Sequence, residues 1–286
     1  MDNPIKVVIL DGGGTVWYSM DVLWRHYQAA FGYFGLLWPQ DFEKQFPLEP
    51  TTLISSLRSF NSRRNMPVAL LAMHFTKTKP DDVLNKRVKG YEGRDPESCL
   101  KHLFYTEAWD SHTGILNLSQ EMGKFLADAL DHYDEINTYP PCKNACEGVK
   151  ELHQLGYKLG LLSNRKRVST ERIIHKLNLR DYFDYVEAPD AWEEPVKKPV
   201  KKILDHFRID PENPIAAVFI GDSNVDINSA RTEKLFTIAV RGGMGDDIVW
   251  EIDPPAERAQ DLMKTAKLLS SFDDEQYRER YVAYIR

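Results

Sequence analysis

Short runs of apolar residues recur along the chain and alternate with helical patterns. The clearest are Val7–Leu10, Lys158–Leu162, Ala216–Ile220 and Phe236–Val240, and a shorter run lies around Tyr185–Glu187. Continuous apolar runs of this length are typical of strands that are buried on both faces of a parallel sheet. Strands that alternate with helices predict an α/β fold with a Rossmann-like, doubly wound parallel sheet.

Helical patterns fill the segments between these strands. Apolar residues recur on one helical face from Ala145 to Leu155, and Gly156 is placed to end that helix. Pro199 is placed in the first turn of another helix, whose inner face begins at Ile203. Further helices are predicted between the last two strands, over residues 169–178, near 256–270 and over 273–284.

Residues 18–138 give mostly helical signals and no alternating strand pattern. The first predicted helix includes Trp24 and ends at Gly35 or Gly32. Others are expected near 50–61, 81–90, 97–107 and 119–133, with Asp81 and Ser119 as N-caps of two of them. The prolines of Tyr139-Pro140-Pro141 then force extended backbone. We therefore predict a core of residues 1–17 and 139–286 and an inserted α-helical cap domain of residues 18–138.

Composition narrows the class of protein. The 286 residues carry a net charge of −6, which gives no support for a nucleic-acid partner or for binding to anionic membranes. No apolar run approaches the roughly 18 to 20 residues that cross a bilayer, and the first residues lack the layout of a signal peptide. Three cysteines favour a reducing compartment, so we expect a cytoplasmic protein. The segment Gln276–Arg286 suits packing on the core or on a second subunit, which leaves a monomer and a homodimer open.

Polar residues follow the predicted strands at their carboxyl ends, which converge on one edge of a parallel sheet. Asp11 ends the first strand, Ser163-Asn164 follows the second, and Asp222 with Asp226 follows the fourth, while Lys198 begins a helix. A carboxylate can accept a phosphoryl group, and clustered carboxylates suit Mg²⁺, which prefers oxygen ligands. Hydroxyl, ammonium and loop amide groups can hold phosphoryl oxygens as charge develops.

Each of these residues has a simpler structural interpretation when it is taken alone. A strand-end acid often caps a helix, Lys198 is compatible with a solvated helix start, and Ser163-Asn164 with a turn. Asp226 could orient Lys198 or cap its helix instead of touching a metal. The occurrence of all of them in this order favours phosphoryl chemistry over coincidence.

With these residues in place, the chain resembles the haloacid dehalogenase-like superfamily. The four family motifs match Asp11 with Gly14-Thr15, then Ser163, then Lys198, and then Gly221-Asp222 with Asp226. The resemblance covers about residues 1–18 and 139–270 and the position of the inserted block. It implies a Rossmann-like core, a helical cap that closes over the substrate, an aspartyl nucleophile and usually Mg²⁺.

The resemblance also implies a role for each matching residue. Asp11 would be the nucleophile and a metal ligand, the Gly13 carbonyl a second ligand and Asp222 a third, directly or through water. Asp226 would be a supporting group or an alternative ligand. The remaining residues would bind the transferring group or support the loop: Ser163, Asn164, Lys198, Gly12 and Thr15. Apart from the resemblance, Arg165-Lys166-Arg167 follow the second motif, and they would favour a substrate with extra negative charge if their side chains pointed into the cleft at this edge of the sheet; a solvated basic turn is the alternative.

One catalytic group of the family is absent. Family phosphatases place a second aspartate two residues after the nucleophile, where this chain has Gly13. Such an acid–base group typically contributes about 10² to 10⁴-fold in rate. Four interpretations stay open: a leaving group that needs little protonation, as in the phosphonate-cleaving branch; dehalogenation, against which Asp222 counts; an acid from the cap, such as His26, His74, His102 or Glu49; or binding without turnover. We therefore expect a Mg²⁺-dependent hydrolase acting on a small phosphorylated or phosphonate-like metabolite through Asp11.

Overall fold

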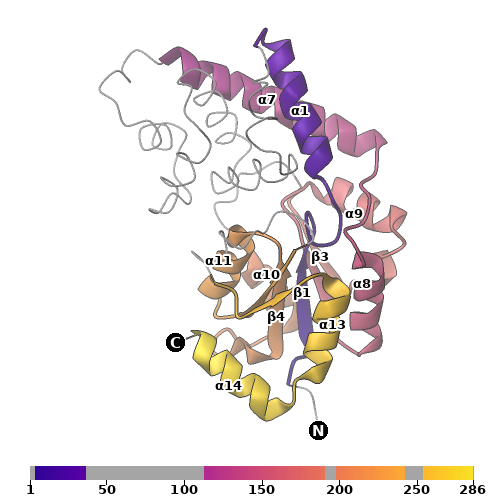
Figure 1. Ribbon diagram of the computed structural model, residues 1–286, viewed down its shortest axis with the longest axis vertical. Helices are drawn as coiled ribbons and strands as arrows, with labels where there is room; N and C mark the ends of the chain where they lie inside the picture. Colours follow the sequence, from indigo (N-terminus) through magenta and orange to yellow (C-terminus); the bar gives the residue numbers. More distant parts are fainter. Residues whose placement is uncertain (1–3, 37–112, 191–197, 242–253, 286) are drawn as a thin grey trace. The chain divides into compact units, whose positions relative to one another are not determined.

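The structure of the chain is a computed structural model that describes residues 4–36, 113–190, 198–241 and 254–285 (Figure 1). It divides into two compact units. The core unit consists of Met1–Ser19 and Thr138–Arg286, and the inserted unit is Met20–Asn137. The helices expected near 50–61, 81–90 and 97–107, the N-cap expected at Asp81, and the cap residues His74, His102 and Glu49 lie outside the described residues.

The core unit is built on one sheet of six parallel strands in the order β3-β2-β1-β4-β5-β6. This arrangement confirms the predicted α/β fold. The four long strands are mostly apolar and are buried along almost their whole length, as strands covered on both faces must be. The strands are β1 (Val7–Asp11), β2 (Lys158–Leu162), β3 (Tyr185–Glu187), β4 (Ala217–Gly221), β5 (Phe236–Val240) and β6 (Glu257–Ala259).

The pairing register fixes which residues meet at the carboxyl edge of the sheet. Asp11 at the end of β1 pairs with Leu162 at the end of β2. On the other side of β1, Leu10 pairs with Ile220 of β4. The residues that follow these strands therefore start from neighbouring positions on the same edge, as the sequence predicted.

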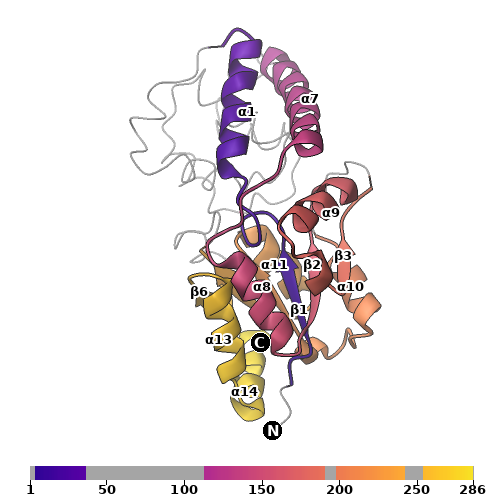
Figure 2. The same ribbon diagram turned by 90° about the vertical axis from the view of Figure 1, so that its right-hand side faces the viewer.

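Helices cover both faces of the sheet (Figure 2). On one face, α8 and α13 pack against each other so closely that a Cβ at Gly148 would lie 2.5 Å from Cβ of Leu262. On the other face, α10 contacts β2 and β3, and α11 contacts β4 and β5. The core helices are α8 (Ala145–Gln154), α9 (Arg167–Lys176), α10 (Val200–Phe207), α11 (Asn224–Thr232), α13 (Leu262–Ser271) and α14 (Asp274–Ile285), with short 3₁₀ helices at Arg180–Tyr182 and Pro214–Ala216.

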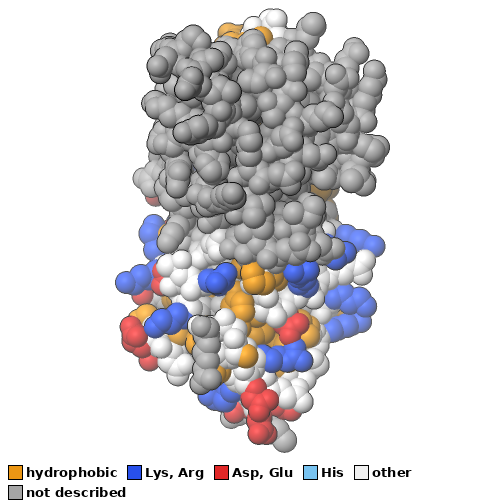
Figure 3. Space-filling view, turned by 60° about the vertical axis from the view of Figure 1, so that its left-hand side comes forward, with side chains coloured by type: hydrophobic (Ala, Val, Ile, Leu, Met, Phe, Trp, Pro, Cys, Tyr) orange, Lys and Arg blue, Asp and Glu red, His pale blue; other side chains and the backbone are white. Residues whose placement is uncertain are grey.

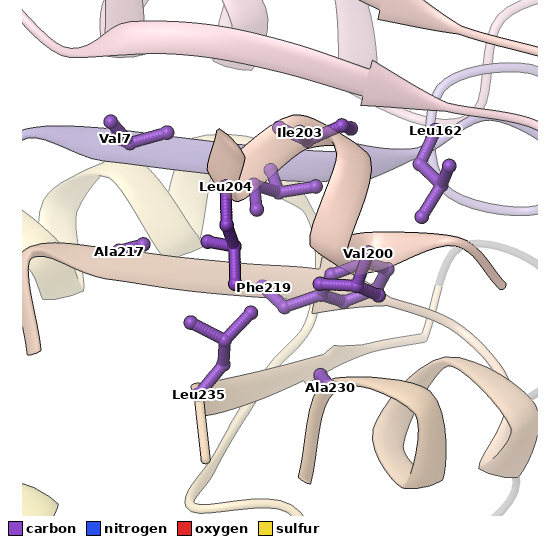
Figure 4. Packing of buried hydrophobic residues seen from close by; sticks show 10 residues of the cluster. Val7, Leu162, Val200, Ile203, Leu204, Ala217, Phe219, Ala230 and Leu235 are labelled. Atoms are coloured by element: carbon purple, nitrogen blue, oxygen red, sulfur yellow. The ribbon is translucent and has the colours of Figure 1, made fainter. Parts of the chain in front are cut away.

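The packing beneath α10 and α11 shows how strand and helix periodicities combine (Figure 4). Alternate residues of a strand share a face, so Val7 and Ile9 of β1 both point toward these helices. Ile203 and Leu204 of α10 bury their side chains on the same cluster and are at most 1% exposed. This packing holds the first residue of α10 next to the carboxyl edge of the sheet.

One predicted helix was partly wrong. A helix was expected near 256–270, but Glu257–Ala259 form the edge strand β6, and α13 begins at Leu262. The side chains of β6 are partly or fully exposed, so the strand has no apolar pattern and depends on backbone pairing with β5. Asp261 then caps α13 by accepting a hydrogen bond from the backbone N–H of Lys264 at 2.9 Å.

The described part of the inserted unit consists of two long helices that pack together, α1 (Met20–Tyr33) and α7 (Thr113–Ile136). Their contact is aromatic: the rings of Tyr33 and Phe125 stack with centroids 4.6 Å apart. Gly35, at a φ of 68°, follows the end of α1, as one of the two predicted stops. Ser119 was expected to cap a helix but lies inside α7, which begins six residues earlier.

The two segments that lead into and out of the inserted unit pair with each other within the core unit. The backbone N–H of Tyr18 donates to the carbonyl of Pro140 at 2.8 Å, and that of Cys142 donates to Val16 at 3.0 Å. Trp17 and Pro141 form an antiparallel bridge between these two bonds. Residues 16–18 and 140–142 therefore form a short two-stranded ribbon, which we call the linker ribbon.

On the face of the core unit in Figure 3, Lys and Arg side chains are spread among Asp and Glu rather than gathered into one basic area. None of the helices in the described ranges has the length and apolar character needed to span a bilayer.

Candidate active site

The loop that follows β1 is a compact turn held by its own backbone. The N–H groups of Val16 and Trp17 both donate to the carbonyl of Gly12, at 2.9 and 3.1 Å, and Gly14 donates to the carbonyl of Trp17 at 2.7 Å. Gly14 has a φ of +91°, a conformation that side chains with a Cβ rarely adopt. Gly14 is thus required by the turn itself.

Two of the three glycines also leave room for particular side chains. A Cβ on Gly14 would lie 2.1 Å from Oδ2 of Asp222, and a Cβ on Gly12 would lie 2.1 Å from Cη2 of Trp17. Both distances are far shorter than real Cβ contacts. Gly13 differs, because its nearest neighbours would be Trp17 Nε1 at 3.7 Å and Ser19 Oγ at 3.8 Å, which are ordinary contacts.

A buried lysine joins two of the predicted acids. The Lys198 Nζ forms an ion pair and hydrogen bond with Oδ1 of Asp11, and it lies 2.6 Å from Oδ1 of Asp226. All three side chains are at most 5% exposed. The Lys198 backbone N–H donates to Oγ of Ser229 at 3.1 Å, which fixes the start of α10 against α11. Ser229 carried no signal in the sequence that pointed to this role.

Asp226 holds the lysine with one oxygen and its own helix with the other. Its Oδ2 accepts hydrogen bonds from the backbone N–H of Ser223 at 3.0 Å and from Ser223 Oγ at 2.7 Å. In return, Ser223 Oγ accepts from the backbone N–H of Asp226, which completes a capping box at the start of α11. The two structural interpretations left open by the sequence, orienting Lys198 and capping the helix, therefore both describe Asp226.

Three carboxylates meet at the centre of the site. Asp11, Asp222 and Asp226 are all buried, and each offers one oxygen atom within 4.8 Å of the other two. Three oxygen ligands in a closed space are the donor set that a hard divalent cation such as Mg²⁺ takes, with water completing its coordination. Both oxygens of Asp226 have partners, one in Ser223 and the other in Lys198, whereas Lys198 pairs with one oxygen of Asp11. Asp11 and Asp222 are therefore the carboxylates best placed to hold an ion.

The electrostatics of the site depend on this clustering. Burial raises the pKa of Asp11 well above its usual range, and the negative charges of Asp226 and Asp222 raise it further, while Lys198 opposes the shift. Burial alone would lower the pKa of Lys198, but the attraction of Asp11 and Asp226 outweighs it, so the net pKa is raised and the ammonium stays charged. A cation held by the carboxylates would offset the repulsion among them.

The residues after β2 approach the site from the other side of β1. Ser163 is 3% exposed, and its Oγ accepts a hydrogen bond from the backbone N–H of Arg165 at 3.1 Å, which shapes the turn and leaves its O–H able to donate. Asn164 is partly buried in the same turn. The Arg165 guanidinium lies over the ring of Tyr139, 4.3 Å from its centroid, and donates to its hydroxyl at 3.0 Å, so it packs on a side chain next to the linker ribbon.

Two side chains of the loop that follows β1, those of Thr15 and Trp17, are buried. Thr15, expected to support the loop, is 1% exposed, and its hydroxyl makes no hydrogen bond to any described residue. Trp17 was not anticipated as part of the site, because an apolar residue in a loop is equally consistent with ordinary core packing. Its indole lies against Gly12 and its Nε1 faces the Cβ position of Gly13.

Comparison with known proteins places the chain in a family. The sequence profile described as haloacid dehalogenase-like hydrolase matches residues 68–240. A phosphoglycolate phosphatase of Nitrosococcus oceani is 29% identical over 51% of this chain and 64% of its own length. The pyrophosphatase PpaX of Bacillus cereus is 30% identical over 38% of this chain and 50% of its own length. The chain thus spans between half and two thirds of these two curated relatives.

The fold comparison agrees with the sequence comparison. A haloacid dehalogenase-like family hydrolase of Streptococcus pneumoniae superposes with a TM-score of 0.56 at 14% identity, covering 95% of this chain and 100% of that structure. At this identity the likeness concerns the fold alone, while the profile match covers more than half of the chain. The chain belongs to the haloacid dehalogenase-like hydrolase family.

Proposed function

We propose that this protein is a Mg²⁺-dependent phosphatase of its family, which transfers the phosphoryl group of a small anionic metabolite to Asp11 and then to water. The observation that carries the proposal is the buried cluster of Asp11, Asp222, Asp226 and Lys198, in which three acids and one ammonium share a closed space. An ion pair that served only the stability of the fold would not need three carboxylates around one lysine, because burying charge without compensation is costly. The names of the relatives, a phosphoglycolate phosphatase and a pyrophosphatase, support a phosphorylated substrate.

In the first chemical step, one oxygen of Asp11 attacks phosphorus and the bond from phosphorus to the leaving oxygen breaks. Lys198 lies beside Asp11, and its ammonium offsets negative charge on the transferring group. Asp226 keeps that ammonium in place through its second ion pair. The Ser163 hydroxyl and the loop amides after Asp11 are the groups that would bind phosphoryl oxygens.

In the second step, water attacks phosphorus and the bond to Asp11 breaks, which returns the free carboxylate. A Mg²⁺ ion bound by Asp11, Asp222 and the Gly13 carbonyl would supply positive charge that neutralises the phosphoryl oxygens. Residues 18–138 serve, in this proposal, as the domain that selects the substrate. We infer a small anionic ligand and neither a nucleic acid nor a membrane as partner, in the cytoplasm and as a monomer or homodimer.

The test compares two substitutions of the same chemical kind. Asp11→Asn removes the nucleophile, whereas Asp184→Asn changes an aspartate at the opposite edge of the sheet, where Asp184 accepts from the backbone N–H of Leu159. Phosphate release is measured with pyrophosphate, acetyl phosphate, phosphoglycolate and glycerol phosphate, with Mg²⁺ and with EDTA. We expect Asp11→Asn to lose more than about 10³-fold of the turnover on every substrate of the parent.

The control variant should keep the parent's activity, and EDTA should abolish it. Equal turnover by Asp11→Asn and the parent would remove Asp11 as the nucleophile. Activity that survives EDTA would contradict the metal assignment. Absence of phosphate release from the whole panel, together with a rise in melting temperature on adding phosphate and Mg²⁺, would favour binding without turnover.

A further inference from the structure

The indole N–H of Trp17 is a buried donor without an acceptor in the described parts of the chain. Trp17 is fully buried, and no described residue accepts a hydrogen bond from Nε1. Buried polar groups in proteins are nearly always paired, because an unsatisfied donor loses its hydration without replacement. A donor left in this state in the loop that follows Asp11 indicates that its partner arrives with the ligand.

The loop fixes the direction of this donor. The six-membered part of the indole lies against Gly12, where no Cβ fits, and the backbone of Trp17 is bound to Gly12 and Gly14 on both its N–H and carbonyl sides. The linker ribbon holds the same residue through its bridge to Pro141. The ring therefore has little freedom to turn, and Nε1 stays directed toward position 13.

The second aspartate of family phosphatases, which this chain lacks, would extend from position 13 of this loop. The Cβ direction of Gly13 is open and ends 3.7 Å from Trp17 Nε1 and 3.8 Å from Ser19 Oγ. An aspartate in that position would have its carboxylate within reach of the indole N–H. In this chain the space is left to the substrate, and its wall carries a donor that does not release its proton at neutral pH.

We propose that Trp17 Nε1–H donates a hydrogen bond to the leaving oxygen of the substrate, and that the substrates are phosphoanhydrides or acyl phosphates. This inference rests on the phosphatase function proposed above. A fixed donor stabilises negative charge that develops on an oxygen but cannot protonate it. A phosphate or carboxylate leaves readily as an anion, whereas an alkoxide needs a proton that neither of the described residues Gly13 and Trp17 supplies.

The reaction balances without an acid at position 13. The bond from Asp11 to phosphorus forms, and the bond from phosphorus to the bridging oxygen breaks with its electron pair on the leaving group. That group departs as an anion while hydrogen-bonded to Trp17. Water then attacks phosphorus, the electrons of the Asp11–phosphorus bond return to the carboxylate, and both protons of the water stay on the released phosphate.

The experiment measures kcat/KM on two substrate classes with variants of the full chain. Pyrophosphate and acetyl phosphate represent anionic leaving groups, and glycerol phosphate represents an alkoxide. The parent should prefer the first class by at least about 10²-fold, the lower end of the usual contribution of a positioned acid. Trp17→Phe, which keeps an aromatic ring but no N–H, should lower kcat/KM on the first class by about 10- to 100-fold.

Two further variants keep the result interpretable if Trp17→Phe unfolds. Replacement of Trp17 by benzothienylalanine puts sulfur in place of the N–H within a ring of the same shape, so packing on Gly12 is preserved. Gly13→Asp places a carboxyl group in the open space and should raise glycerol phosphate hydrolysis by about 10² to 10⁴-fold, so that the preference disappears.

The outcomes separate this inference from the proposed function. Turnover that depends on Asp11 but shows no preference between the classes would overturn the role of Trp17 alone. Unchanged anhydride hydrolysis in the benzothienylalanine variant would mean that the indole N–H binds only a structural water. Turnover that is independent of Asp11, or absent on every substrate, would overturn both.

Discussion

Gly14 is the position at which a single methyl group should do most damage to the site. Its backbone has a φ of +91°, and a Cβ there would lie 2.1 Å from Oδ2 and 2.4 Å from Cγ of Asp222. Gly13, its neighbour, offers a matched control. A Cβ there would meet nothing closer than 3.7 Å, and its φ lies outside the left-handed range. We therefore compare Gly14→Ala with Gly13→Ala.

The size of the effect follows from two separate costs. Holding alanine at a positive φ costs about 1–3 kcal/mol, and displacing a packed group costs about 1–3 kcal/mol more. The lower entropy of the unfolded chain returns about 0.4–1 kcal/mol. Gly14→Ala should thus lower the free energy of unfolding by about 2–5 kcal/mol, whereas Gly13→Ala should stay within about 1 kcal/mol of the parent.

Urea unfolding followed by circular dichroism measures the free energy of unfolding, and a Mg²⁺ titration by calorimetry measures the affinity of each variant for the ion. If the loop relaxes by pushing Asp222 aside, the loss of stability will be smaller and the Mg²⁺ affinity should fall by about 10- to 100-fold, as when a ligand loses its support. Parent-like stability together with parent-like Mg²⁺ affinity in Gly14→Ala would refute the reasoning. So would equal losses in both alanine variants.

Two predictions concern groups around the site and at the far edge of the sheet. Ser223→Ala removes the capping box of α11 and one donor to Asp226, and should cost about 1 kcal/mol in urea unfolding and lower kcat; unchanged values would contradict this role. Burial alone would raise the pKa of Asp184, but the Lys158 ammonium and the Leu159 N–H hold that pKa below its usual range. Asp184→Asn should therefore cost about 1 kcal/mol at pH 7, a difference that shrinks as pH falls below about 4; a constant difference would exclude this linkage.

The shared edge of the acids could be predicted because it depends on strand direction, and the order of the strands then sets which acids are neighbours. Parallel strands bring their carboxyl ends to one edge, and β1 pairs with β4, so Asp11 and Asp222 lie near each other. The dual role of Asp226 could not be assigned from the sequence. Orienting Lys198 and capping α11 need different oxygens of one carboxylate, and only the packing of α10 against α11 shows that both occur.

Other features had no usable signal. The strand β6 is short and polar and exists because β5 offers an unpaired backbone edge, which local patterns do not record. Trp17 reads in the sequence as one more apolar residue, and its direction depends on the missing side chain of Gly12. The sequence shows that position 13 has no side chain, but it does not show which group lies next to the space that a side chain would fill. The Trp17 donor beside Gly13 could therefore not be predicted.

The linker ribbon has a consequence for how the protein can vary. Because residues 16–18 and 140–142 are hydrogen-bonded neighbours, the chain leaves and re-enters the core at points only one strand spacing apart. The entropy of closing such a loop grows slowly, by about 0.6 kcal/mol for each doubling of its length. The length of the insert therefore has little effect on the free energy of unfolding of the core. The segment of residues 20–137 can thus become longer or shorter, or be exchanged, while the carboxyl edge of the sheet stays the same.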